Sequence, residues 1–333
     1  MTTADNRERS RRILVTHNTI ASSAVALLEA NDVDVFFSPP YDPPEIVAAR
    51  AKELAVDAIM VRQGRINDLV IGASPKLRVI VKHGVGVDNV DIKAAAARGI
   101  PVIRSMGSNA RAVAEHAIAL TLTLIKEIAP LNAAVKAGEW PKPSFIGRDI
   151  AGSRIGLVGY GSIGRETARL ARLLGMDVLV YDPVAAEEAL AEGHAVTGDV
   201  DEVITGCDVV SLHCPLTSAT RHLINAERLA RMKPGALVVN TARGGIIDEA
   251  ALAEALASGR IAGAALDSFA AEPPAPDSPL WRLPNLVATP HIGGVTHGSA
   301  RSMAEIAARH IISVLDGNPP DARSVAHPAD LAA

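Results

Sequence analysis

Three glycines near the middle of the chain have the spacing of a phosphate-binding turn. Gly159, Gly161 and Gly164 form a G-x-G-x-x-G sequence between an apolar run and a helix-like segment. The first glycine permits a tight turn, the second lets the backbone approach a pyrophosphate, and the third lets the helix pack closely against the strand. The first helical residues, Ser162 and Ile163, offer free N–H groups to phosphate oxygens. The pattern therefore predicts a dinucleotide-binding site.

An acidic residue follows this turn where a ribose contact is expected. Asp182 comes directly after a second apolar run, Val178 to Tyr181. A carboxylate at this point accepts hydrogen bonds from the ribose hydroxyls and repels a 2′-phosphate. No arginine follows in residues 183–187, so the sequence predicts NAD rather than NADP as the cofactor. An aspartate that only favours a turn is the alternative interpretation.

Two more polar residues follow apolar runs, at positions where open α/β sheets bind ligands. Arg243 follows the run Ala236 to Asn240, and its guanidinium can hold a carboxylate through two hydrogen bonds and polarise a carbonyl. His291 follows the run Leu286 to Thr289, and its ordinary pKa near neutrality suits a general acid and base. A solvated arginine and an isolated histidine are the plainer alternatives.

A carboxylate is available as a partner for this imidazole. Glu272 lies in a loop before two prolines, after a predicted strand that ends near Asp267. A carboxylate beside an imidazole raises the imidazole pKa and fixes its tautomer. The residues alone do not pair Glu272 with His291.

The N-terminal third contains a glycine loop and several cations. Gly84-Val85-Gly86 follows the predicted strand Leu77 to Val81, and exposed N–H groups there would form a nest for a substrate carboxylate. A plain tight turn is the alternative. A phosphate could also be bound here, by Arg62, Arg65 and Lys82, although surface cations are the plainer interpretation.

The composition indicates a globular protein without polyanionic partners. The 333 residues suffice for two domains, and with 48% hydrophobic and 21% charged residues a packed core is expected. A net charge of −4 argues against nucleic acid or an anionic membrane as the main partner. Cys207 and Cys214 lack paired spacing, so we expect reduced thiols and no metal site. The segment Met1 to Arg12 has no apolar signal-peptide core and no apolar stretch approaches spanning length, so a cytoplasmic location is expected.

The elements that must position these residues alternate between strands and helices, which predicts an α/β fold with two doubly wound parallel sheets. The first unit is expected to contain strands at Arg12 to Thr16, Val33 to Phe37, Ala58 to Val61 and Leu77 to Val81, with helices at Ile20 to Ala30, Pro44 to Leu54 and near Asn67 to Ala73. The second unit is expected to contain later strands at Asp208 to Leu212, Ala236 to Asn240, Gly263 to Leu266 and Leu286 to Thr289. One long helix from Asn109 to about Ala137, an irregular arm from Gly138 to Arg148 and a last helix from His297 to Leu315 complete the pattern.

The position of the glycine turn, halfway along the chain, predicts an inserted cofactor domain. Residues 107–295 are expected to form a Rossmann NAD-binding domain. Residues 1–106 and 296–333 are expected to form a flavodoxin-like substrate-binding domain, with the C-terminal helix returning to it. Ligands commonly bind between such domains, which places the expected active site there.

Taken together, these motifs resemble those of the D-2-hydroxyacid dehydrogenase family, and most closely its D-3-phosphoglycerate dehydrogenase branch. The matching blocks cover most of the chain between Arg62 and Gly294 in the family's order. They are HGVGVDNVD from His83, NARAVAEHAIAL from Asn109, GLVGYGSIGRETA from Gly156, SLHCPLTSATRHLIN from Ser211, MKPGALVVNTARGGIIDEAALAEAL from Met232, AALDSFAAEPP from Ala264 and LPNLVATPHIGG from Leu283.

The resemblance implies a catalytic trio of Arg243, Glu272 and His291. In that scheme His291 takes or returns the hydroxyl proton, Glu272 tunes it, and Arg243 holds the substrate's carboxylate and carbonyl. Resemblance also implies NAD contacts by Ser162, Ile163, Asp182, Cys214, Thr241, Asp267 and Gly294, with Asp267 on the carboxamide. It further implies a homodimer, assembled through the long helix from Asn109 and the arm that contains Trp140.

The substrate is less well defined than the reaction. A glutamate at position 272 suits a reaction that moves a proton with the hydride, which disfavours formate oxidation. The chain ends soon after its last helix, so we expect no regulatory domain and no serine feedback. The phosphoglycerate branch commonly has arginine and a hydroxylated residue where this chain has Lys82 and Val85.

The first expectation for the substrate is D-3-phosphoglycerate. The nearest alternative is a small 2-keto acid such as hydroxypyruvate or glyoxylate. An alternative of another class is a protein that senses NAD(H) without turnover, like the co-repressors of the same fold.

Overall fold

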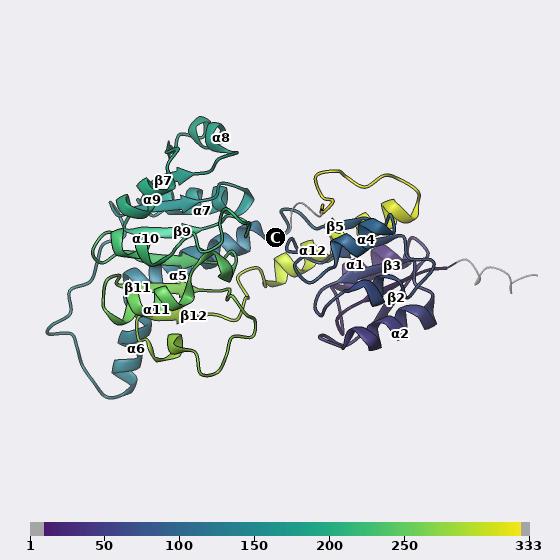
Figure 1. Ribbon diagram of the computed structural model, residues 1–333, viewed down its shortest axis with the longest axis horizontal. Coiled ribbons are helices and arrows are strands. Elements are labelled where there is room, and N and C mark those ends of the chain that lie inside the picture. Colours follow the sequence, from purple (N-terminus) through teal and green to yellow (C-terminus); the bar gives the residue numbers. More distant parts are fainter. Residues whose placement is uncertain (1–9, 328–333) are drawn as a thin grey trace, which may run out of the picture. The chain divides into compact units, whose positions relative to one another are not determined.

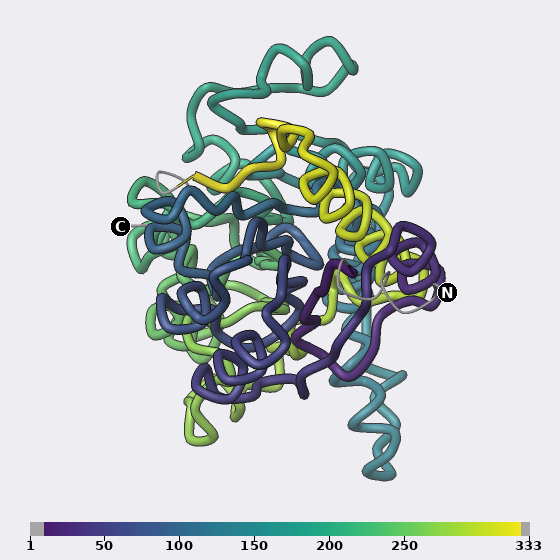
Figure 2. The backbone as a smooth tube through the Cα atoms, turned by 90° about the vertical axis from the view of Figure 1, so that its right-hand side faces the viewer, coloured from purple at the N-terminus to yellow at the C-terminus, as the bar shows by residue number. Residues whose placement is uncertain are grey.

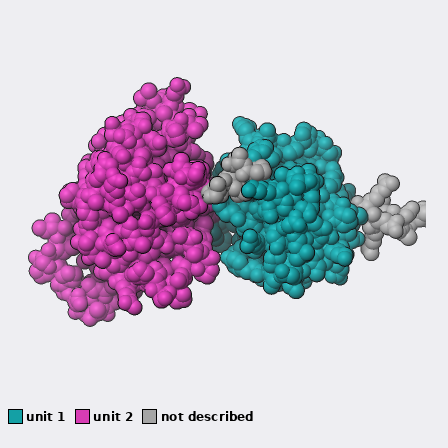
Figure 3. All heavy atoms as spheres, in the orientation of Figure 1, with its two compact units in different colours: residues 1–109, 295–331 teal, residues 110–294, 332–333 magenta. Residues whose placement is uncertain are grey.

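The chain folds into two compact units. The computed structural model describes residues 10–327. Unit 1 runs to Asn109 and resumes at Val295, and unit 2 runs from Ala110 to Gly294 (Figure 3). Most of the polar segment from Met1 to Arg12, and the end of the chain, lie outside the described residues.

Unit 1 contains one five-stranded sheet in which all paired strands are parallel. Its order is β2-β1-β3-β4-β5, the flavodoxin-like order of a doubly wound sheet. The strands are β1 (Arg11–Val15), β2 (Val33–Phe37), β3 (Ala58–Val61), β4 (Val79–Lys82) and β5 (Val102–Arg104). The helices are α1 (Ser22–Glu29), α2 (Pro44–Leu54), α3 (Asp68–Ile71), α4 (Ile92–Ala97) and α12 (His297–Leu315).

Alternate residues of these strands enter two separate cores. In β1, Ile13 and Val15 pack with α1 and α12, while Leu14 packs with α2, α3 and α4. The strands are therefore apolar on both faces, as expected when helices cover both sides of a parallel sheet. The C-terminal helix α12 lies beside α1 in the first core (Figure 2).

Unit 2 contains a seven-stranded parallel sheet of order β12-β11-β10-β9-β6-β7-β8. Figure 1 labels four of these strands, β7, β9, β11 and β12. Counted from β6 as the first strand, this is the Rossmann order 3-2-1-4-5-6 with one further strand. The strands are β6 (Arg154–Val158), β7 (Asp177–Tyr181), β8 (Ala195–Val196), β9 (Val209–Leu212), β10 (Leu237–Asn240), β11 (Gly263–Leu266) and β12 (Leu286–Ala288). The helices are α5 (Ala110–Ile125), α6 (Ile128–Lys136), α7 (Ser162–Leu173), α8 (Ala186–Ala191), α9 (Val200–Gly206), α10 (Ala226–Arg231) and α11 (Glu249–Ala257), with 3₁₀ turns η1 (Gly244–Ile246) and η2 (Pro279–Arg282).

Two cores also flank this sheet. Residues of α5 and α7 pack against one face, and residues of α9, α10 and α11 pack against the other. The predicted fold class, two doubly wound parallel sheets, is confirmed.

The structure corrects the prediction of one long helix from Asn109 to about Ala137. The helix ends at Ile125, and α6 begins after Glu127, which has a left-handed φ of 50°. Pro130 is the third residue of α6. A proline ring clashes with the carbonyl four residues earlier and offers no N–H to it, so a continuous helix through Lys126 is excluded.

The first sheet also has more elements than predicted. Helix α4 and strand β5 follow Lys82, so β4 is not the last strand of the N-terminal segment. Strand β5 is only three residues long, and in unit 2 the unpredicted β8 has only two. Strands of two or three residues are too short to show an alternation of apolar and polar residues in the sequence.

The segment after α5 is exposed. Helix α6 has no buried residue, and in the irregular stretch after it Trp140 and Ile146 are 70% and 89% exposed. Among the described residues no single helix is long and apolar enough to span a membrane; α5 and α6 reach that length only together, with a bend of 59° between them.

Candidate active site

The glycine turn lies where the chain reverses its direction of progress across the sheet of unit 2. Strands β6 and β9 are neighbours at this point, and ligands of open α/β sheets bind at such switch points. Gly159 has a φ of 105°, and a Cβ there would lie 2.6 Å from the carbonyl carbon of His213, after β9. A Cβ on Gly164 would lie 2.2 Å from the carbonyl oxygen of Gly159. Only glycine fits at these two positions.

The surroundings of the turn fit a dinucleotide. A Cβ on Gly161 would meet no described atom within 4 Å, and α7, which begins at Ser162, has no side-chain cap for its first N–H groups. Thr241, after β10, has a buried hydroxyl without a hydrogen-bond partner among residues 10–327. A phosphate at the helix end and a polar group beside Thr241 would satisfy these donors and acceptors.

Asp182 holds the loop after β7 as an ionised carboxylate. It accepts hydrogen bonds from the backbone N–H groups of Tyr160 (2.6 Å), Val184 (2.7 Å) and Ala185 (2.9 Å). Burial alone would raise its pKa, but these three bonds bring the pKa below its ordinary value. A carboxylate accepts about four hydrogen bonds, so one position remains for a ribose hydroxyl.

A cation near this loop that could bind a 2′-phosphate is already engaged. Arg165, in the first turn of α7, forms ion pairs with Glu188 and Glu192. Its guanidinium also lies over the ring of Tyr160, 5.1 Å from the centroid. Because Arg165 is engaged in these contacts, the negative charge of Asp182 acts on the part of a ligand that binds beside it.

His291 and Glu272 form a hydrogen-bonded pair. The imidazole Nδ1 lies 2.8 Å and 3.0 Å from the two carboxylate oxygens of Glu272, and the N–H of Phe269 donates to the same carboxylate at 3.0 Å. An ionised carboxylate only accepts, so Nδ1 carries the hydrogen and Nε2 is the nitrogen available for proton transfer. The hydrogen bond that His291 donates to Glu272 raises the pKa of His291, against burial and the charge of Arg243, which lower it.

The glutamate itself stays ionised. Burial would raise the pKa of Glu272, but the hydrogen bonds from His291 and from the Phe269 N–H, together with the charges of His291 and Arg243, lower it. The influence of Arg243 on both pKa values indicates that the three residues share one electrostatic environment.

Arg243 is held in an extended loop after β10. The side-chain amide of Asn240 donates to its carbonyl at 2.9 Å, and its own Nη1 donates to the carbonyl of Ala242 at 2.8 Å. The next residue, Gly244, packs so closely that a Cβ would lie 1.9 Å from the carbonyl carbon of Phe269. The loops that carry Arg243 and Glu272 are therefore packed backbone against backbone.

Asp267 supports the turn that carries His291. It is 2% exposed and accepts hydrogen bonds from the Thr289 hydroxyl (2.6 Å) and from the N–H groups of Ile292 (2.9 Å) and Gly293 (2.8 Å). Burial would raise its pKa, but these bonds and one from His116 lower it.

Sequence reasoning did not single out His116, although it lies within a motif that carried the resemblance. A lone histidine on an apolar helix gives no signal by its spacing, because its partners follow strands far along the chain.

Cys214 lies beside the glycine turn. A Cβ on Gly159 would approach its backbone nitrogen to 2.7 Å. Burial raises the pKa of the Cys214 thiol to about 11, so the thiol is neutral.

A family comparison places these motifs in a known group. Residues 118–293 match the family model described as D-isomer specific 2-hydroxyacid dehydrogenase, NAD binding domain. The chain belongs to the D-isomer specific 2-hydroxyacid dehydrogenase family. The predicted family and NAD as the cofactor of this domain are thereby confirmed.

Several relatives of this family are similar over most of the chain. D-3-phosphoglycerate dehydrogenase of Archaeoglobus fulgidus is 38% identical over 90% of this chain and 56% of its own length. Hydroxypyruvate reductase of Thermotoga maritima is 41% identical over 74% of this chain and 80% of its own. The crystal structure of the TT0316 protein from Thermus thermophilus matches with a TM-score of 0.83 and 34% identity, over 95% of this chain and all of that one. The chain spans little more than half the length of the D-3-phosphoglycerate dehydrogenase from Archaeoglobus.

The predicted substrate residues lie in unit 1, at the carboxyl ends of β3 and β4. Lys82 donates from Nζ to the Asn89 side chain at 2.8 Å and to the carbonyl of Arg62 at 3.3 Å. Arg62 Nη1 lies 3.4 Å from Nδ1 of His17 and donates to the carbonyl of Thr19 at 3.2 Å. Strands β1 and β3 are neighbours here, so this cluster lies at the switch point of the flavodoxin-like sheet.

The glycine loop beside this cluster is partly covered. Gly84 is buried, with a φ of 140°, and its carbonyl accepts a hydrogen bond from the N–H of Ser105. Val85 and Gly86 are half-buried. The anion nest predicted for Gly84, Val85 and Gly86 stays a prediction.

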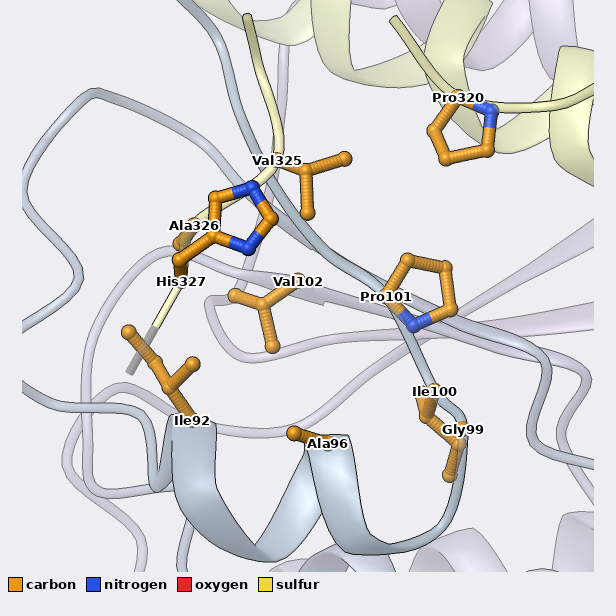
Figure 4. A pocket seen from close by; sticks show the side chains of 10 residues that line it. All are labelled: Ile92, Ala96, Gly99, Ile100, Pro101, Val102, Pro320, Val325, Ala326 and His327. Atoms are coloured by element: carbon orange, nitrogen blue, oxygen red, sulfur yellow. The ribbon is translucent and has the colours of Figure 1, made fainter. Parts of the chain in front are cut away.

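A pocket of about 400 Å³ in unit 1 lies away from this chemistry. Figure 4 shows its lining by α4, the start of β5 and the segment around Val325, mostly with apolar side chains. It borders the amino end of β5, whereas the cations lie at the carboxyl ends of β3 and β4. Residues 10–327 contain no group of three or more His, Cys, Asp or Glu that could hold a metal ion.

Replacing Asp182 by asparagine should weaken discrimination between the two nicotinamide cofactors. The repulsion between the carboxylate and a 2′-phosphate is lost, so the ratio of Kd for NADPH to Kd for NADH should fall by about tenfold, which corresponds to about 1.4 kcal/mol. Titration of cofactor fluorescence measures both constants. Asp177→Asn, at the other end of β7, should leave the ratio unchanged, and an unchanged ratio in Asp182→Asn would contradict the role of Asp182.

The imidazole of His291 should stay protonated to a higher pH than an ordinary histidine. Its pKa in the folded protein is raised above about 6.5 chiefly by Glu272, so Glu272→Gln should bring the midpoint of its titration to lower pH. NMR titration of the imidazole C–H signal, assigned with His291→Gln, measures the midpoint. Glu254→Gln on α11 is the control, and the same midpoint in Glu272→Gln and wild type would refute the coupling.

Proposed function

We propose that this chain catalyses the NAD-dependent interconversion of a D-2-hydroxyacid and its 2-keto acid. The observation that carries the proposal is the His291–Glu272 pair, whose free Nε2 belongs to the same unit as the glycine turn. Family membership supports it.

Each polar residue of the trio has a separate role. In oxidation His291 accepts the hydroxyl proton at Nε2, and in reduction it returns a proton to the carbonyl oxygen. Glu272 raises the imidazole pKa and fixes the tautomer, while Arg243 binds the carboxylate and polarises the carbonyl. NAD, when bound, supplies the hydride acceptor for the substrate carbon. The contacts assigned to Ser162, Ile163, Cys214, Thr241, Asp267 and Gly294 are part of this proposal.

D-3-phosphoglycerate is the first proposed substrate. The cluster of Arg62 and Lys82 at the switch point of unit 1 offers two cations for a phosphate, with Arg65 exposed in the same loop. Similarity to phosphoglycerate dehydrogenases supports this assignment.

Hydroxypyruvate or glyoxylate is the second proposed substrate. Lys82 Nζ is already bound by Asn89 and by the carbonyl of Arg62, which reduces its capacity to bind a phosphate. The Thermotoga relative named hydroxypyruvate reductase is at least as similar in sequence as the phosphoglycerate dehydrogenase quoted above.

Turnover of NADH on a panel of 2-keto acids tests the function. Phosphorylated and unphosphorylated acids are compared by loss of absorbance at the nicotinamide band. We expect oxidation of NADH with at least one acid, and a fall of about 10²–10⁴-fold in kcat for His291→Ala because general acid–base catalysis is lost. Arg243→Ala should lose activity to a similar extent.

Two outcomes would overturn this proposal. Wild-type turnover by His291→Ala would remove the acid–base assignment. Tight binding of NADH without turnover of any acid would favour the NAD(H)-sensing alternative.

We further propose a homodimer that buries the exposed segment after α5. Ile128 and Val135 on α6 and Trp140 and Ile146 beyond it are each at least half exposed, an apolar surface that a partner copy would cover. Trp140→Lys combined with Ile146→Asp should convert dimer to monomer in sedimentation velocity. Leu173→Lys, at an exposed position of α7, is the control, and a wild-type monomer would contradict the proposal.

The other partner predictions stay predictions. The net charge of −4 supports the expectation of a small-molecule ligand in place of nucleic acid or an anionic membrane. The expected cytoplasmic location is tested by cell fractionation.

A further inference from the structure

Three side chains from distant parts of unit 2 form one hydrogen-bonded chain. His116 Nε2 on α5 lies 3.0 Å from the hydroxyl of Thr289, which follows β12. The Thr289 hydroxyl lies 2.6 Å from Oδ1 of Asp267, which follows β11. His116 Nε2 is also 3.5 Å from the same carboxylate oxygen.

The direction of these hydrogen bonds follows from the chemistry of the groups. The Asp267 carboxylate has a lowered pKa and is ionised, so it only accepts. Thr289 must therefore give its single hydroxyl hydrogen to Asp267 and accept from His116. It follows that His116 carries its hydrogen on Nε2.

This chain of bonds ends on the turn that carries His291. His291 has a left-handed φ of 55°, which a non-glycine residue adopts only when its surroundings enforce it. The next two N–H groups, of Ile292 and Gly293, are both held by Asp267. A Cβ on Gly293 would lie 2.9 Å from Asp267 Oδ2 and 3.2 Å from Cδ2 of His116, so the turn packs closely against both side chains.

The chain of bonds also joins the two ends of unit 2. His116 lies in the second turn of α5, whose first residue, Ala110, begins the unit. The turn from His291 to Gly294 ends it. The position of the His291 imidazole therefore depends both on the sheet, through β11 and β12, and on helix α5.

We propose that His116 is a positioning residue that, through Thr289 and Asp267, holds the His291 turn in the geometry needed for proton transfer. The catalytic part of this inference rests on the proposed function of His291. The structural part, that His116 helps to hold the turn, does not depend on that function. His116 itself need not contact the substrate.

Four variants separate the hydrogen bond from simple packing. His116→Leu removes the N–H donor, and Thr289→Val removes the hydroxyl that links it to Asp267. His116→Gln keeps an N–H donor, and Thr289→Ser keeps a hydroxyl. In NADH-dependent reduction we expect His116→Leu and Thr289→Val to lower kcat by about tenfold, with KM for NADH changed by less than about twofold, because misplacement of a catalytic group affects turnover more than cofactor binding. His116→Gln and Thr289→Ser should recover most of the kcat. His310→Leu, on α12 of unit 1, is the control.

Amide hydrogen exchange gives a readout that does not require activity. The N–H groups of Ile292 and Gly293 should exchange faster in His116→Leu and Thr289→Val than in wild type, with protection restored in His116→Gln and Thr289→Ser. A kcat of wild-type size in folded His116→Leu, or unchanged exchange of these two N–H groups, would overturn the inference. If wild type turns over none of the acids, the proposed function fails, and the exchange pattern alone then decides whether His116 holds the turn.

Discussion

The candidate site depends on the parallel register of the strands of unit 2. Asn240 pairs with Leu266, and Leu266 pairs with Ala288, so β10, β11 and β12 end at the same level. Neighbouring strands are about 4.8 Å apart, so the loops that follow them start side by side. On the other side of the sheet centre, Val158 pairs with Tyr181 and with Leu212, which brings the glycine turn and the loop of Asp182 to the same edge. Residues distant in sequence thus become neighbours, although no local sequence pattern links them.

Within this edge, two carboxylates take different roles because their donors differ. Asp267 is nearly enclosed and binds backbone N–H groups and a hydroxyl, so its charge stabilises a turn. Glu272 is 39% exposed at its side chain and binds an imidazole, so its charge acts on a group that can titrate. Burial opposes ionisation in both, and hydrogen bonds overcome it in both. Arg243 lowers the pKa of His291 and Glu272 raises it, and the hydrogen bond that His291 donates to Glu272 prevails.

Prediction from sequence was most accurate where local chemistry is strong. The helix Pro44–Leu54 begins and ends as predicted, since proline suits the first helical turn, and the β-branched and aromatic run Val33–Phe37 forms the predicted strand. Prediction missed β5 and β8, whose two or three residues are strands only because a neighbouring strand pairs with them. Pro130 indicates a break in the helix after Ile125. The prediction missed this break because the apolar pattern continues through it.

The sequence by itself determined the family, the dinucleotide site and the residue types able to transfer a proton. These features follow from short motifs, because their glycines and charged residues are close together in the sequence. The pairing of Glu272 with His291 was predicted only from the resemblance to the family. Tertiary structure decided which groups those residues touch: the N–H groups that hold Asp182, the partners of the Asp267 carboxylate and the contact of His116 with Thr289. The physical reason is that a hydrogen bond requires two groups about 3 Å apart, and only strand register and helix packing set such distances between residues far apart in sequence.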